Sequence, residues 1–250
     1  MSERSERIAT ERALCGGAAP RDIMSAWWHT TRLIAKRDLL VEWRSRIALN
    51  QVFPFAGIVM VMFGFAIDDT RLMERIAPGL IMLATMFSLL ILVQRSFAVE
   101  SEDGALDALR TAGVSSSALF WGKSMAMAVQ LAALEALLVV LAILLYGSTI
   151  RPSGVVLLIA TWLAASWGLA TVGTLYGGLA AGARGRETLL PLLLLPVVAP
   201  VLIGATRAVE AALGARGSVA DGWPWMGLVA VFAAVFCAGG TLAFGPLIDE

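Results

Sequence analysis

The chain has 250 residues, of which 58% are hydrophobic and only 15% are charged, and its mean hydropathy is +0.79. This composition argues against a soluble globular domain and favours a membrane protein. The formal net charge of zero carries no information about partners, because the charges are segregated along the chain.

The first 23 residues are polar and contain acidic residues as well as arginines. They predict a disordered cytoplasmic tail and not a signal peptide. The sequence leaves open whether the protein starts at Met1 or at Met24. Cys15 in this tail and Cys237 inside an apolar run make an implausible disulfide pair.

Residues 24–46 interleave tryptophans and apolar residues with five basic side chains, which are Arg32, Lys36, Arg37, Arg44 and Arg46. This pattern predicts a helix that lies in the membrane interface. The alternative is an ordinary basic flank that only sets topology. His29 in this helix has no companion ligands in the sequence, so we expect a solvated histidine and no metal site.

Six apolar runs are long enough to cross a hydrocarbon core about 30 Å thick. They are Ile47–Ile67, Ile76–Gln94, Ser124–Tyr146, Val155–Ala181, Leu189–Ala205 and Trp225–Leu247. The expected fold class is therefore an all-α polytopic membrane protein, with residues 47–250 as a six-helix domain. These runs leave no room for a second globular domain.

The distribution of basic residues predicts the orientation of the chain. With the N-terminus inside, fourteen of the nineteen Lys and Arg residues fall in inner segments. The positive-inside rule then places both termini in the cytoplasm.

Glycines and prolines mark the fourth and fifth runs. Gly173 and Gly177 form a small-xxx-small pair that favours close helix packing, either within the chain or across a dimer seam. Pro196 and Pro200 predict a bend or break in the fifth span. After it, residues 206–217 resemble a short separate helix with a glycine cap.

Glu135 lies near the middle of the third run, where a carboxyl group is costly and should face the protein interior or a cavity. Contact with a substrate and a hydrogen bond to a neighbouring helix are both open. Trp162 and Trp167 are weaker candidates for contact with a flat aromatic substrate, and helix packing is their alternative role.

Ser117–Ser124 ends in Gly-Lys-Ser, like a P-loop, but it lacks the first glycine and leads into an apolar run. We therefore expect no ATP binding by this chain. Lys123 is interpreted as a snorkelling interfacial lysine, with Trp121 as its partner in the aromatic belt.

The segment between the second and third runs carries the carboxylates Glu100, Glu102, Asp103 and Asp107. Ser101 or Asp103 can cap a helix whose first turns favour acidic side chains. Leu106 and Leu109 would form its apolar edge. We predict a cytoplasmic coupling helix over Glu100–Thr111, and a solvated loop is the alternative.

The same region resembles the CcmB family, the haem-exporter permeases of cytochrome c maturation. Arg-Ile-Ala-Pro-Gly at residues 75–79 matches the family pattern. So do the further positions Arg95, Phe97, Asp103, Gly104, Leu106 and Leu109. Glu100 stands where the pattern has an aspartate. Residues 36–45 and 194–208 also look like the family's N-terminal helix and fifth span.

The resemblance implies an ABC-2-type fold, a homodimer and a bacterial inner-membrane location. It also implies a separate CcmA-type ATPase docked on the coupling residues, which are Glu100, Glu102, Asp103, Gly104, Leu106, Asp107 and Leu109. Further implied partners are a CcmC-type haem-handling protein and a CcmE-type haem chaperone. ATP would be bound by the partner and haem is the candidate cargo, but whether haem crosses this subunit stays open.

Three other functions are alternatives to a haem-exporter permease. A generic ABC-2 permease could export a lipid, a glycan or a drug. An intramembrane enzyme would need clustered acids or histidines within the spans, where only Glu135 is found. A passive scaffold would bind its partners without altering their ATP turnover.

Overall fold

The computed structural model describes residues 20–45, 48–102, 115–148, 150–181, 186–215 and 217–249. The regular structure in these ranges is helical. In chain order the elements are α2 (Pro20–Ser45), η1 (Ala48–Val52), α3 (Phe53–Ala66), α4 (Thr70–Glu102), α6 (Ser116–Tyr146), η2 (Pro152–Gly154), α7 (Val155–Ala181), α8 (Arg186–Leu213) and α9 (Val219–Asp249).

Five of these helices, α4 and α6 to α9, are long and apolar enough to cross a membrane. The chain is therefore a polytopic all-α membrane protein, as predicted. Helix α4 exceeds the predicted second span at both ends, because it begins at Thr70 and continues to Glu102.

The first predicted span, Ile47–Ile67, differs from the observed element. Its regular α-helix, α3, has only 14 residues and follows the π-helical turn η1. Fourteen residues extend about 21 Å, which is less than the hydrocarbon core. Pro54 explains where α3 begins, because proline is favoured in the first turn and disfavoured further inside a helix.

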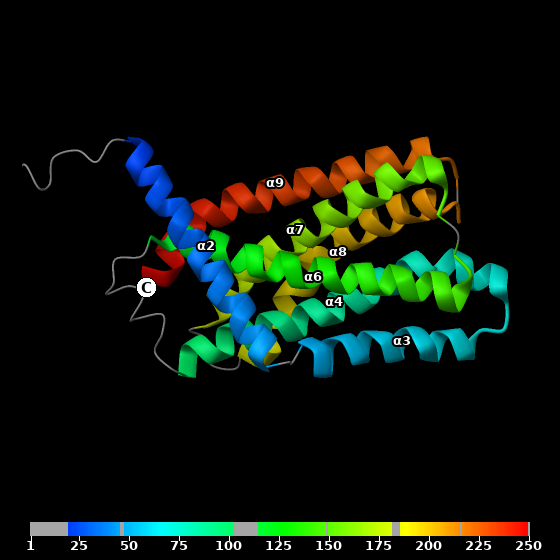
Figure 1. Ribbon diagram of the computed structural model, residues 1–250, viewed down its shortest axis with the longest axis horizontal. Coiled ribbons are helices and arrows are strands. Elements are labelled where there is room, and N and C mark those ends of the chain that lie inside the picture. Colours follow the sequence, from blue (N-terminus) through cyan, green and yellow to red (C-terminus); the bar gives the residue numbers. More distant parts are fainter. Residues whose placement is uncertain are drawn as a thin grey trace, which may run out of the picture.

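The long helices run side by side, with α7 packed against α4, α6, α8 and α9 (Figure 1). Helix α3 packs on α4 and α6 at the edge of the bundle. Helix α2 crosses one end of the bundle obliquely and packs on α6. We call this the α2 end; the C-terminus lies there too, and the α3–α4, α6–α7 and α8–α9 connections lie at the opposite end.

The glycine pair of α7 packs within the chain. An added Cβ at Gly173 would come 2.8 Å from Val93, and one at Gly177 would come 2.4 Å from Phe97. Both neighbours belong to α4, so these glycines allow α4 and α7 to approach closely. Packing within the chain, one of the two predicted roles, is confirmed here.

Helix α8 runs without interruption through Pro191, Pro196 and Pro200. The predicted break is therefore absent. Pro196 and Pro200 are exposed, whereas the opposite side of α8 is buried against α4, α7 and α9. Packing along this face supports the helix where the prolines remove backbone hydrogen bonds.

The helix predicted after the fifth span is the last part of α8 and not a separate element. Its glycine cap is confirmed, since Gly214 has φ +76°. Arg151, from the α6–α7 connection, donates to the carbonyl oxygens of Gly214 and Gly217 at 3.3 and 3.0 Å. This side chain links two connections at the end opposite α2.

Candidate coupling site at the α2 end

Helix α2 lies unusually close to α6. Gly122 of α6 faces Ile34 and Thr31, and an added Cβ would come 2.7 Å from Ile34 and 3.0 Å from the Thr31 carbonyl oxygen. Ile34 and Thr31 are both buried. Only glycine permits this approach without a shift of α2.

Lys123, the next residue of α6, is only 2% exposed. Its Nζ lies 3.4 Å from Asp38 Oδ2 on α2 and donates to Ser96 Oγ on α4 at 3.3 Å. The ammonium also lies 4.7 Å from the centroid of the Phe97 ring. The prediction of a snorkelling lysine is wrong, because acidic, hydroxyl and aromatic partners from α2 and α4 enclose this charge.

A second ion pair lies beside the first. Arg95 of α4 approaches Glu42 of α2, with 3.7 Å between Nε and Oε2. Asp38 also receives Arg37 Nε at 3.2 Å. Because Asp38 and Glu42 are one helical turn apart, α2 presents two carboxylates to two different helices.

These ion pairs border a small cavity of about 70 Å³ between α2, α4 and α6. Its polar lining includes Arg37, Asp38, Glu42, Arg95, Ser96, Lys123 and Gln130, and its apolar lining includes Leu92 and Met127. The α2 end therefore has a mixed polar and apolar interior.

Tryptophans extend the contact from α2 towards α9. The rings of Trp27 and Trp121 are 6.4 Å apart, and those of Trp121 and Trp167 are 5.8 Å apart. Their indole nitrogens donate to Ser117, Thr241 and Cys237 respectively, at 3.0, 3.0 and 2.9 Å. Trp121 is thus bonded inside the bundle, which corrects its assignment as the belt partner of Lys123. Trp167 has the packing role that was its alternative.

The predicted coupling residues are only partly within the described ranges. The backbone of Glu100 and Glu102 forms the last turn of α4, so Ser101, one of the two predicted caps, does not begin a separate helix. Asp103, Gly104, Leu106, Asp107 and Leu109 lie outside the described residues, and the coupling helix stays a prediction. The structure does show where the segment is attached, because α4 ends at Glu102, shortly after Phe97, and α6 begins at Ser116, shortly before Gly122.

Glu135 lies at the contact of α6 with α7 and is 1% exposed. Ser166 Oγ of α7 donates to its Oε2 at 2.8 Å. Within the described part of the chain, Oε1 has no hydrogen-bond partner. The hydrogen bond to a neighbouring helix, one of the two predicted arrangements, is present. Nearby, Trp162 Nε1 donates to the Ala132 carbonyl oxygen at 3.0 Å, which assigns it to the same contact.

The fold and the α2 end define a helical membrane protein in which two bundle helices, α4 and α6, are held by ion pairs to a crossing N-terminal helix. Comparison with known proteins gives its family. Residues 29–247 match the family model described as CcmB protein, so the chain belongs to the CcmB family. The matched range includes nearly all of the α2 end.

Curated relatives agree with this assignment. The chain is 30% identical to Heme exporter protein B of Rhodobacter capsulatus, over 74% of this chain and 84% of that protein. It is also 30% identical to Heme exporter protein B of Paracoccus denitrificans, over 84% and 92% respectively. For the Haemophilus influenzae protein of the same name the identity is 28%, over 72% and 80%. The resemblance read from residues 75–109 is therefore confirmed.

Proposed function

We propose that this chain is the membrane-embedded permease subunit of an ABC transporter that exports haem, or drives release of a haem chaperone, in c-type cytochrome maturation. The match of residues 29–247 to the CcmB family carries this proposal. The names of the relatives favour haem over the lipid, glycan or drug of a generic ABC-2 permease.

The subunit is a transporter component and not an enzyme. A separate CcmA-type ATPase binds and hydrolyses ATP, and haem is cargo and not a resident cofactor. The partner docks on the coupling segment Glu100–Thr111, where Leu106 and Leu109 supply the apolar anchors. The four carboxylates orient the encounter, since charges at the rim of an interface govern association and specificity more than affinity.

Anchoring at the α2 end supports this role for the segment. Arg95 precedes the segment and contacts Glu42 of α2, and Lys123 follows the segment and contacts Asp38 of α2. Ser96 joins α4 to α6 here, because it accepts a hydrogen bond from Lys123. A movement of the segment during ATP turnover is therefore transmitted to α2 and to the bundle together. A segment attached to α4 and α6 alone would transmit less of this motion.

We also propose how the subunit is arranged in the membrane and with which proteins it assembles. Six spans, with η1 and α3 together as the first, form an ABC-2-type fold that assembles as a homodimer in the bacterial inner membrane. Helix α2 lies in the cytoplasmic interface, and both termini are cytoplasmic. A CcmC-type haem-handling protein and a CcmE-type haem chaperone complete the assembly.

Purification of the tagged chain from its native membrane tests the proposal. We expect an ATPase subunit and haem-handling proteins to co-purify, and deletion of the chain to abolish covalent haem attachment to c-type cytochromes. Normal cytochrome c levels in the deletion strain would refute the haem role. Recovery of a glycan- or lipid-processing enzyme in place of haem proteins would favour the generic permease.

A further inference from the structure

Helix α2 has a second face, beside the one that packs on the bundle, that borders a groove. The buried face carries Thr31, Ile34, Ala35 and, partly, Asp38. Adjacent to it, α2 and Met125 of α6 enclose an open groove of about 450 Å³. Its walls are apolar and include Leu39, Leu40 and Trp43. We call this feature the α2 groove.

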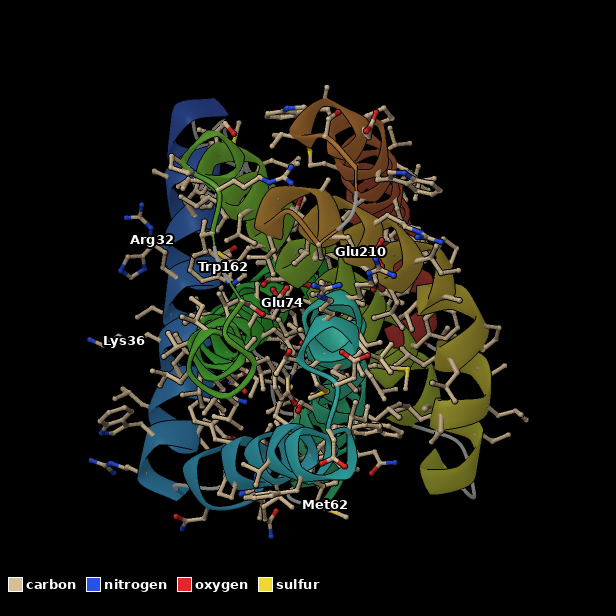
Figure 2. The ribbon with its side chains drawn as sticks, turned by 90° about the vertical axis from the view of Figure 1, so that its right-hand side faces the viewer. Arg32, Lys36, Met62, Glu74, Trp162 and Glu210 are labelled. Carbon is tan, nitrogen blue, oxygen red and sulfur yellow. The ribbon has the colours of Figure 1, made fainter. Side chains whose placement is uncertain are left out.

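Two basic residues stand at the edge of the α2 groove. Arg32 and Lys36 are one turn apart, line the groove and are exposed. Figure 2 shows both side chains pointing away from the bundle. Among the described residues, those that line the groove include no acidic side chain. Within the described ranges neither residue forms an ion pair or hydrogen bond, in contrast to Arg95 and Lys123 on the other side of α2.

An apolar groove with two adjacent unpaired cations is complementary to one kind of ligand that a membrane supplies. The acyl chain of a phospholipid fits the apolar walls, and its phosphodiester is attracted to the cations. The long stems of Arg32 and Lys36 can lie along apolar surface while their charged ends reach the headgroup. A zwitterionic lipid would gain less, since its own cationic group opposes this field.

We propose that the α2 groove binds one anionic phospholipid, with its acyl chain along Leu39, Leu40 and Met125 and its headgroup on Arg32 and Lys36. The bound lipid would pack against α2 and α6 together, next to the contact of Gly122 with Ile34. Anionic lipid thereby stabilises α2 in its docked position. The proposal requires a membrane protein but not a particular cargo or ATPase.

The purified full-length chain tests this proposal through lipid retention measured by native mass spectrometry. The probes are phosphatidylglycerol and phosphatidylcholine, titrated separately. The test variant is Arg32→Gln/Lys36→Gln. The control is Arg71→Gln/Arg75→Gln, which removes two exposed basic side chains of α4 near the end opposite α2.

The test variant should lose affinity for phosphatidylglycerol by roughly 30-fold, at about 1 kcal/mol for each charge. The control should bind like the wild type, and phosphatidylcholine should bind weakly to all three. Met125→Trp, which fills the groove, should reduce retention of both lipids. Unchanged phosphatidylglycerol binding by the test variant, or an equal loss in the control, would overturn the proposal. Unchanged lipid retention with loss of self-association would assign the groove to a second copy and would also overturn it.

Discussion

Lys123 of α6 and Asp38 of α2 form an ion pair, with 3.4 Å between Nζ and Oδ2, at a point where the lysine is almost wholly buried. The pair joins residues 85 positions apart. It fixes the crossing helix to the N-terminal part of α6, the helix that follows the segment that we propose binds the ATPase.

Lys123→Met should loosen α2 because it removes the ion pair between α6 and the partly buried Asp38, which keeps its contact with the neighbouring Arg37 of α2 itself. We expect a loss of about 2–3 kcal/mol in the stability of the α2 contact, typical of an ion pair broken by removal of one partner. Limited proteolysis of the purified chain, with cleavage within α2 as the readout, measures this. The double change Lys123→Met/Asp38→Leu should restore most of the protection, and equal cleavage of the single and double variants would contradict the pairing argument.

Gly122→Ala should displace α2 through direct steric overlap with Ile34. Overpacking of this kind costs about 1–3 kcal/mol. The thermal unfolding midpoint of the purified protein should fall for the single variant. Gly122→Ala/Ile34→Ala should not restore it, because the Ile34 Cβ, which alanine retains, itself lies 2.7 Å from the added Cβ. Gly227→Ala is the matched control, because an added Cβ there has no neighbour within 4 Å. An equal effect of both single variants would show that helix contact is not the cause.

The sequence was sufficient to predict the long helices, the family and the close packing at Gly173 and Gly177, because apolar run length and small-residue spacing are local signals. It also indicated a helix over residues 24–46, which overlaps α2 (Pro20–Ser45). Helix α2 begins at Pro20, so the last residues of the predicted disordered tail are helical. These features depend on residues close together in the chain.

The burial of Lys123 could not be predicted in the same way. A lysine at the start of an apolar run is usually interfacial, and its partner Asp38 lies in a basic stretch on a distant helix. The acidic residues Asp38 and Glu42, spaced by one turn within that stretch, were the available signal. The continuity of α8 could likewise not be predicted. The tendency of proline to break a helix is a property of the local sequence, whereas the packing that keeps α8 continuous comes from three other helices.

Glu135 is expected to have a role in transport and not only in folding. Glu135→Gln retains the shape and the acceptor for Ser166 but removes the acidic group. We expect reduced cytochrome c maturation with unchanged amounts of the protein in the membrane, measured by haem staining and immunoblotting. Ser166→Ala is the control for the hydrogen bond alone. Full maturation with Glu135→Gln would show that the acidic group is not needed.

The proposed orientation predicts opposite labelling at the two ends of the bundle. Ser218 lies in the α8–α9 connection and Ser116 begins α6 near the α2 end. In a variant without native cysteines, a membrane-impermeant maleimide applied from the periplasmic side should label Ser218→Cys but not Ser116→Cys. The reverse pattern would invert the topology and remove the coupling segment from the ATPase.

We propose that a separate ATPase holds this chain through the segment between α4 and α6. The direct measurement is co-purification of the ATPase with Leu106→Ala/Leu109→Ala, compared with Leu192→Ala/Leu193→Ala, which shortens two exposed leucines of α8. The first pair should weaken binding by about 2–5 kcal/mol, as for apolar anchors in other interfaces, and should abolish recovery of the ATPase without reducing membrane insertion. The control pair should retain it. Wild-type recovery and normal ATP turnover with Leu106→Ala/Leu109→Ala would contradict the account and leave the segment as a solvated connection.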